Sequence, residues 1–128
     1  MKKQIIIANV LFALAMIMAH GVLAAGSSVG PAVYLFLNEK DQDSGCKYLY
    51  SIYEGSKAGL PKGVKTARLD VNDTKNEPLF KRFDVRILPT VLFVNGKGEA
   101  TKKIFGEGAD TEKQLKAAFQ KANEFVGK

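Results

Sequence analysis

Two short apolar runs and one amphipathic segment between them set the framework of the chain. The runs Ala32–Leu37 and Thr90–Val94 are almost continuously apolar, which is typical of strands covered on both faces of a sheet. Between them, apolar side chains recur at the spacing of one helix face: Cys46, Leu49, Tyr50 and Tyr53. Gly55 and Gly59 follow this segment and predict its end. The sequence therefore predicts a strand, a polar loop and a helix whose first turn holds Cys46.

Weaker patterns predict the next elements. The segment Val64–Val71 alternates enough to predict a second strand. The segment Thr74–Glu77 has the spacing of a capping box and precedes Pro78, which a first helical turn tolerates, so a short helix is expected there. The sequence Asn95–Gly98 predicts a hairpin, and the returning strand should cover about Ala100–Phe105.

The last helix is expected to begin at Asp110 or Thr111. Its apolar residues keep helical spacing: Leu115, Ala118, Phe119, Ala122 and Val126. The order of elements is therefore β-α-β-α-β-β-α. Because a strand–helix–strand unit requires a parallel pair and a hairpin an antiparallel one, the predicted fold class is α/β, with a mixed four-stranded sheet and helices on both faces.

The first 25 residues have the pattern of a secretory signal peptide. A basic start, Met1–Lys3, precedes the apolar run Ile5–Ala19, and the small residues Ala24 and Ala25 follow. The run is short for a membrane span, which needs about 20 apolar residues. We expect cleavage after Ala24 or Ala25, with an uncleaved membrane anchor as the alternative. Residues 26–128 would then form one domain without a membrane span, exported to the periplasm or secreted.

Composition and charge exclude several functions. The net charge of +6 falls to +4 when the two lysines of the signal segment are removed, and the basic residues are spread along the chain, so no nucleic-acid partner is expected. The only histidine, His20, lies in the signal segment, and one cysteine with scattered carboxylates makes no zinc or copper set. No metal or cofactor is therefore expected. Glu39, Asp41 and Asp43 are interpreted as an exposed acidic loop rather than a calcium site.

Cys46 is the only cysteine, which is unusual for an exported protein. A leftover thiol there indicates an intermolecular disulfide, a small-thiol cap, a reactive site or a buried inert side chain. The first turn of a helix favours the thiolate, because unpaired backbone N–H groups and the positive end of the helix dipole lie close to the sulfur. Asp43 or Ser44 can cap this helix.

From about Ala32 to Phe125 the chain resembles the thioredoxin family. Four segments carry the resemblance: Gly45-Cys46-Lys47, Arg68–Asp73, Phe83–Thr90, and Phe93–Gly96 with Gly106. The first is similar to the end of the family's Cys-x-x-Cys-Lys turn, and the second to a strand end that reads Lys-Leu-Asn-Ile-Asp. The third is the most specific, because it resembles Tyr-Gly-Ile-Arg-Gly-Ile-Pro-Thr. Too few residues precede Ala32 for the first strand and helix of full thioredoxins, which leaves the minimal core of the fold.

The resemblance implies a peptide-binding groove beside Pro89. In the family this proline is cis, faces the active-site turn and exposes a backbone stretch that pairs with an extended substrate peptide. Leu88 and Thr90 would frame that groove here, and Ser44 and Gly45 would stand between the two active-site positions. A rigid turn without a ligand is the alternative interpretation.

The chain departs from the family at the active site. Asp43 stands where the attacking cysteine is expected, and a carboxylate cannot replace a sulfur in disulfide exchange. Cys46 aligns with the resolving cysteine, and a carboxylate so close to it should oppose thiolate formation. Gln42 replaces the family's tryptophan, and no match is found for the buried aspartate on the first strand. In an alternative alignment, Cys46 is the attacking residue of a monothiol site that Lys47 activates.

Two functions remain open on these grounds. In the first, the protein belongs to the thiol–disulfide exchange family, binds an extended cysteine-bearing peptide beside Pro89 and at most forms a mixed disulfide through Cys46. It would then be a single-thiol oxidoreductase rather than a dithiol reductase, with a protein or peptide thiol or disulfide as its partner. In the second, it is a redox-inactive binding or chaperone-like module, and Cys46 is a buried core residue. A homodimer linked through Cys46 is a third option.

Overall fold

The computed structural model describes residues 30–41 and 43–127, so the predicted signal peptide, residues 1–25, lies outside the described residues. The elements in chain order are β1 (Ala32–Leu37), α3 (Ser44–Ser56), η1 (Lys57–Gly59), β2 (Lys65–Asp70), η2 (Thr74–Asn76), α4 (Glu77–Arg82), β3 (Thr90–Val94), β4 (Ala100–Phe105), α5 (Ala109–Gln120) and α6 (Ala122–Val126). Within this part of the chain, no helix combines the length and the apolar character that a membrane crossing requires.

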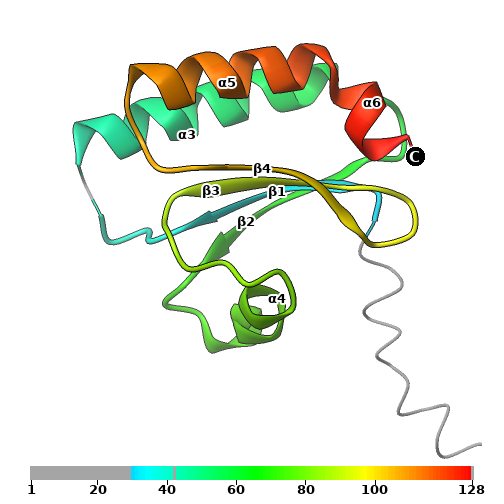
Figure 1. Cartoon of the computed structure of the whole chain (residues 1–128). Helices are drawn as coiled ribbons and strands as arrows, with labels where there is room; N and C mark the ends of the chain where they lie inside the picture. Colours follow the sequence, from blue (N-terminus) through cyan, green and yellow to red (C-terminus); the bar gives the residue numbers. More distant parts are fainter. Residues whose placement is uncertain (1–29, 42, 128) are drawn as a thin grey trace, which may run out of the picture.

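The strands form one mixed sheet in the order β2-β1-β3-β4. β1 and β2 are parallel, whereas β3 is antiparallel to both β1 and β4. Figure 1 shows α3, α5 and α6 on one face of the sheet and α4 on the other. The arrangement confirms the predicted α/β fold, its mixed four-stranded sheet and the placement of helices on both faces.

The central strands β1 and β3 supply the two apolar cores, because alternate side chains of a strand point to opposite faces of the sheet. The core under α3 and α5 takes these side chains of the two strands: Val33, Leu35, Leu37, Val91 and Phe93. The core over α4 takes the alternate set: Ala32, Tyr34, Phe36, Leu92 and Val94. All positions of both strands are buried, which explains why their sequences are continuously apolar.

Tyr53 fixes α3 over the parallel pair of strands. Its side chain is fully buried, and its hydroxyl lies 2.8 Å from the carbonyl oxygen of Val33 in β1 and 3.2 Å from that of Ala67 in β2. The predicted apolar face of the helix is confirmed, since Cys46, Leu49 and Tyr50 are buried as well. The first turn of α3 is thereby held at the carboxyl end of β1.

Two helix starts differ from the prediction. The capping box at Thr74–Glu77 is wrong in detail, because Asp73 accepts a hydrogen bond from the backbone N–H of Lys75 and a 3₁₀ turn, η2, precedes α4. The last helix begins at Ala109, one residue before the earlier of the two predicted starts, after Gly108 at φ 118°. It is also interrupted at Lys121, which separates α5 from α6.

The hairpin between β3 and β4 is confirmed, and β4 has the predicted bounds. The Asn95 side-chain oxygen accepts from the backbone N–H groups of Lys97 at 2.9 Å and Glu99 at 3.0 Å. Gly98 adopts φ 82°, which glycine reaches without steric cost. The tight hairpin makes β4 an edge strand whose last residue leads directly into the candidate site.

Candidate functional site

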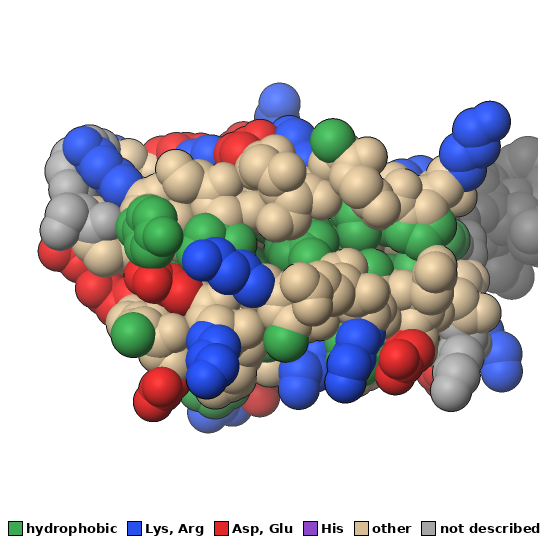
Figure 2. Space-filling model, turned by 90° about the horizontal axis from the view of Figure 1, so that it is seen from above, with side chains coloured by type: hydrophobic (Ala, Val, Ile, Leu, Met, Phe, Trp, Pro, Cys, Tyr) green, Lys and Arg blue, Asp and Glu red, His purple; other side chains and the backbone are tan. Residues whose placement is uncertain are grey.

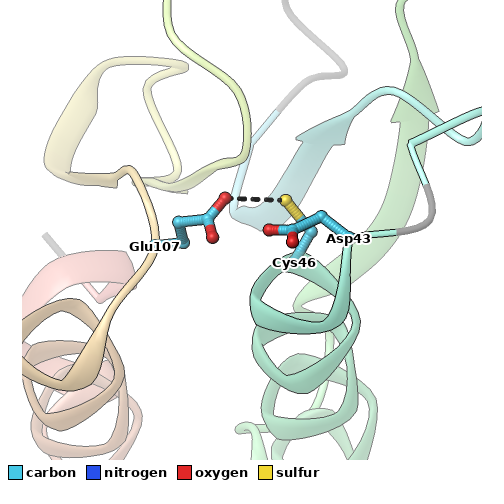
Figure 3. Close-up of side chains that lie close together, drawn as sticks. All are labelled: Asp43, Cys46 and Glu107. Atoms are coloured by element: carbon cyan, nitrogen blue, oxygen red, sulfur yellow. Dashed lines mark hydrogen bonds between the residues drawn. The ribbon is translucent and has the colours of Figure 1, made fainter.

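The predicted residues Asp43, Ser44, Gly45 and Cys46 lie at the start of α3. Figure 3 shows Cys46 and Asp43 at the start of α3, facing Glu107 from the turn between β4 and α5. Ser44 is the first residue of α3, and Gly45 follows it. Glu107 was not expected from the sequence, because 61 residues separate it from Cys46.

The Cys46 thiol is buried and surrounded by acceptors. Only 1% of the residue is exposed, and its sulfur belongs to the core under α3 and α5. Sγ lies 3.2 Å from Oε2 of Glu107 and 3.5 Å from Oδ2 of Asp41, so the S–H group donates toward carboxylates. A thiol has one proton, and the two carboxylates therefore compete for it.

This environment stabilises the thiol form of Cys46. Burial, as the largest cause, and the neighbouring carboxylates of Glu107 and Asp41 together raise its pKa to about 12. At neutral pH the sulfur is protonated. The expectation that the start of the helix favours a thiolate is therefore overridden by burial and by negative neighbours. The carboxylates that oppose the thiolate are those of Glu107 and Asp41, whereas the sequence analysis expected that effect from Asp43.

Three glycines allow Glu107 to reach the site: two permit the backbone conformation of its turn, and the third leaves space for its carboxylate. Gly106 and Gly108, on either side of it, have φ of 95° and 118°, backbone angles that residues other than glycine rarely adopt. A Cβ atom on Gly45 would lie closer than 3.0 Å to Oε1 of Glu107. The Glu107 carboxylate thus lies directly over the start of α3. The sequence signal that could have found it is the Gly106-Glu107-Gly108 run.

Asp43 occupies the N-cap position of α3 without capping it. Its side chain accepts no hydrogen bond from the first turn of the helix. The Asp43 carboxyl instead lies beside that of Glu107, and this contact is the main cause that raises the pKa of Glu107. We refer to Asp41, Asp43 and Glu107, all exposed, as the carboxylate cluster.

Glu39 does not join the carboxylate cluster. Its carboxylate binds Arg68 at 3.0 Å, and Arg68 also binds Glu54 at 3.2 Å. The guanidinium lies 5.3 Å from the ring centre of Tyr50. Burial, as the largest cause, and the neighbouring Cys46, Asp41 and Glu39 together raise the pKa of Tyr50 to about 12. The predicted acidic loop is thus exposed, as expected, but only part of it faces the thiol.

One ligand atom each from Asp43, Cys46 and Glu107 lies within 4.8 Å of the other two, which is close enough to share a metal ion. The sequence did not predict this grouping. Oxygen ligands suit hard cations, whereas a thiol must lose its proton before it binds a metal. Because the Cys46 thiol holds its proton at neutral pH, the two exposed carboxylates are the more available ligands.

The Pro89 segment is hydrogen-bonded to the turn that carries Glu107. The Leu88–Pro89 bond is cis, as the resemblance implied. Pro89 and Thr90 are buried and Leu88 is half-buried. The carbonyl of Pro89 accepts from the N–H of Gly106 at 2.9 Å, which ties this segment to the turn that carries Glu107.

The backbone of Leu88 is open to a ligand. Among the described residues, neither its N–H nor its carbonyl forms a hydrogen bond. The half-exposed side chains of Ile87 and Phe105 lie next to it and line a hollow of about 190 Å³, here called the Ile87 hollow. Its full lining is Asp84, Val85, Arg86, Ile87, Thr90, Lys103 and Phe105. Ile87 and Phe105 had not been singled out in the sequence.

Solved structures similar to this chain are thioredoxins. Oxidized thioredoxin O2 from Arabidopsis thaliana has a TM-score of 0.60 and 17% identity, over 79% of this chain and 86% of that one. Oxidised thioredoxin from Plasmodium falciparum has a TM-score of 0.57 and 15% identity, over 80% and 89%. The germline-specific thioredoxin Deadhead from Drosophila melanogaster has a TM-score of 0.56 and 21% identity, over 83% and 92%.

No family model and no curated protein matches the sequence. The structural likeness, at identities of 21% or less in these three, establishes the fold, which is thioredoxin-like. The chain carries this fold with a single cysteine and without a Cys-x-x-Cys pair. Its chemistry must therefore be argued from its own residues.

Proposed function

We propose that the protein is an exported peptide-binding module on a thioredoxin-like scaffold that does not exchange disulfides. The observation that carries the proposal is the state of Cys46, which is 1% exposed and has its pKa raised to about 12 by burial and carboxylates. Disulfide exchange needs an accessible thiolate. A protonated sulfur inside the core does not meet that requirement.

The position of Asp43 supports the same conclusion. It stands three residues before Cys46, where the family's attacking sulfur is expected, and its carboxylate faces Glu107. A carboxylate forms no bond to sulfur under these conditions, so a dithiol cycle has no first step here.

Peptide binding is supported by the open backbone of Leu88 and by the Ile87 hollow. An extended peptide alongside Leu88 would accept from its N–H and donate to its carbonyl, as in strand addition at a sheet edge. The half-exposed side chains of Ile87 and Phe105 would contact one apolar side chain of that peptide. Backbone pairing gives affinity in this mode, and the pocket gives selectivity.

A single-thiol reaction is the second candidate, favoured by the carboxylate Oε2 of Glu107 at 3.2 Å from Sγ. After local opening, Glu107 would accept the thiol proton, the Cys46 sulfur would attack a partner disulfide, and the partner's other sulfur would leave as a thiolate. A Cys46-linked homodimer requires two such exposed sulfurs, and the burial of Sγ argues against it.

Export rests on the apolar segment at the start of the sequence, Ile5–Ala19, and on the small residues after it. We propose that cleavage leaves a mature chain beginning near residue 26, in the periplasm or outside the cell. The mass of the protein recovered from cells measures this directly, and a full-length chain would refute cleavage.

The first experiment compares labelling of Cys46 by a small disulfide reagent in the native and the unfolded chain at neutral pH. We expect labelling only after unfolding. Rapid labelling of the native protein would instead support the single-thiol reaction.

Peptide binding is tested with a random peptide library displayed on phage and selected on the native chain. We expect binders whose affinity falls with Phe105→Ser, which removes the apolar wall of the Ile87 hollow. Val71→Ser is the matched control, because Val71 is similarly exposed but follows β2, at the opposite edge of the sheet. Selection that yields no binder would overturn the proposal.

A further inference from the structure

We propose that the peptide bound beside Leu88 carries a carboxylate close to the apolar residue that enters the Ile87 hollow, and that Lys103 binds this carboxylate. The inference rests on the proposed peptide-binding function and names the chemical class of its ligand. The source of the carboxylate is either an aspartate or glutamate side chain or the C-terminus of the peptide.

The Ile87 hollow lies on the face of the sheet that α4 covers. Lys103 and Phe105, two residues apart on β4, point to the same face. Their partners across the β3–β4 ladder are Leu92 and Thr90, and Leu92 belongs to the core over α4. The segment Asp84–Ile87 completes the lining. The hollow is thus bounded by an edge strand and by the segment that leads to the groove.

Two side chains of the hollow are large, apolar and half-exposed. Ile87 and Phe105 are each 50% exposed. In the part of the chain that the structure describes, the only other large apolar side chains with comparable exposure are Tyr48 and Val71, and neither lines the hollow. Exposed apolar side chains that gather on a concave surface are typical of ligand sites.

Lys103 gives the hollow a cation that no carboxylate neutralises. Its Nζ donates to the carbonyl oxygens of Phe83 at 2.9 Å and Asp84 at 3.5 Å. Within residues 30–41 and 43–127 it forms no ion pair. An ammonium group has three N–H donors, so at least one remains for a ligand. The carbonyls orient the group but leave its charge in place, which makes a carboxylate the matching ligand.

The other two charged groups that line the hollow are paired with each other. Nε of Arg86 lies 2.7 Å from Oδ1 of Asp84. The hollow is therefore lined by two cations and one anion, and the charge that remains is positive and belongs to Lys103.

The open backbone of Leu88 places the peptide beside the hollow. Leu88 directly follows Ile87, and its N–H and carbonyl form no hydrogen bond among the described residues. In an extended peptide, side chains two positions apart lie on the same side. One apolar side chain would contact Ile87 and Phe105. The C-terminal carboxylate of that residue, or an acidic side chain two positions away, would then lie toward Lys103.

The carboxylate cluster lies on the other face of the sheet. Glu107 contacts Cys46, whose side chain belongs to the core under α3 and α5. Figure 2, which views that face, shows acidic side chains gathered at its left end, where α3 begins. A peptide carboxylate on the side of the hollow therefore meets Lys103, whereas one on the α3 side meets negative charge.

The test uses synthetic copies of the peptides that the phage selection on the native chain yields. We expect aspartate or glutamate to be enriched two positions from an apolar residue. Replacing the acid by its amide, asparagine or glutamine, should weaken binding about fivefold or more, because a charge-assisted hydrogen bond is lost. The Lys103→Gln chain should bind both peptides equally, and the Lys103→Arg chain, which keeps the charge, should keep the preference.

A second pair of peptides identifies the source of the carboxylate. A selected peptide is shortened to end at its apolar residue and is made with a free or an amidated C-terminus. Tighter binding of the free form would support the inference with the peptide end as the source. A preference for the acidic side chain alone would support it with that side chain as the source. A preference for neither carboxylate would overturn it.

The matched control is Lys102→Gln, which removes the same charge one residue earlier on β4. Lys102 pairs with Phe93, whose side chain lies in the core under α3 and α5, so it points away from the hollow. This variant should keep the preference for the acidic peptide. An equal loss in Lys102→Gln and Lys103→Gln would mean general attraction to a basic protein and would overturn the inference.

The remaining outcomes separate the two proposals. Binders without a preference for a carboxylate would overturn this inference and leave peptide binding intact. A selection without binders would overturn peptide binding, and this inference with it. If Lys103→Gln does not fold, equal affinity of the native chain for the acidic and the neutral peptide would still overturn the inference, as would loss of the preference in Lys103→Arg.

Discussion

At Cys46, two opposite electrostatic effects act on one sulfur. The start of a helix stabilises a nearby anion by about 0.3–1 kcal/mol, which is less than one pKa unit, since one unit corresponds to about 1.4 kcal/mol. Burial, Glu107 and Asp41 together raise the pKa from 9.0 to about 12, which is several times larger. The second effect therefore decides the protonation state. The sequence showed the position in the first turn, but it could not show Glu107, whose approach depends on the folded turn after β4.

We expect alkaline pH to destabilise the folded protein through Cys46. In the unfolded chain the thiol loses its proton near its ordinary pKa of 9.0, whereas in the folded chain it keeps the proton up to about pH 12. Between these values the folded state binds more protons, so the free energy of unfolding falls as the pH rises, approaching about 1.4 kcal/mol per pH unit. Urea unfolding at steps from about pH 8 to about pH 10 measures this slope.

The control for this prediction is Cys46→Ala, which should show a flatter dependence on pH whatever its stability at neutral pH. Tyr34, Tyr50 and Tyr53 also have raised pKa values, mainly because of burial, but their ordinary pKa is 10.0. Below about pH 10 the thiol is therefore the main group that distinguishes the two proteins. Equal slopes would contradict a raised pKa for Cys46.

At the scale of the elements, strands were predicted more accurately than helix starts. β1, β3 and β4 have the predicted bounds, because a run of apolar residues between polar loops limits a buried strand at both ends. The start of α5 was misplaced because Gly108, at φ 118°, and not a polar side chain, precedes the first turn. Several neighbouring residues in the sequence could precede the first turn of α5. The folded turn after β4 determines that Gly108 is the one that does.

The attachment of α3 to the sheet gives a prediction at this scale. Tyr53→Phe removes a buried hydroxyl that lies within hydrogen-bond distance of the carbonyls of Val33 and Ala67. We expect a loss of about 1–2 kcal/mol in the free energy of unfolding and a lower Tm, measured by urea and thermal unfolding. Tyr48→Phe is the control, since Tyr48 is half-exposed on the same helix. A loss as large in the control, or none in Tyr53→Phe, would contradict the role assigned to the hydroxyl.

At the scale of the whole molecule, the net charge did not predict where positive and negative side chains gather on the surface. The chain is basic overall, at +6, yet its candidate site is acidic. The sequence could not show that Glu39 differs from Asp41 and Asp43 in the same loop. The difference is its ion pair with Arg68, which comes from β2. The groove residues Leu88, Pro89 and Thr90 could be located by resemblance, whereas the exposed Ile87 and Phe105 depend on how β4 pairs with β3.

If the scaffold lacks only the attacking sulfur, one substitution should restore exchange. Asp43→Cys places a second thiol three residues before Cys46, with Ser44 and Gly45 between them, and removes one carboxylate of the cluster. We expect this variant to form a reversible internal disulfide and to reduce insulin in the presence of dithiothreitol, while the native chain shows no activity above dithiothreitol alone.

The control for this substitution is Tyr48→Cys, which also gives two thiols but places the second on a half-exposed position of α3 without the Cys-x-x-Cys spacing. It should not reduce insulin. Failure of Asp43→Cys together with success of the same change combined with Glu107→Gln would show that Glu107, at 3.2 Å from Sγ, still holds the thiol proton. Reduction of insulin by the native chain at the rate of the Asp43→Cys variant would refute the redox-inactive function, because Cys46 alone would then suffice for exchange.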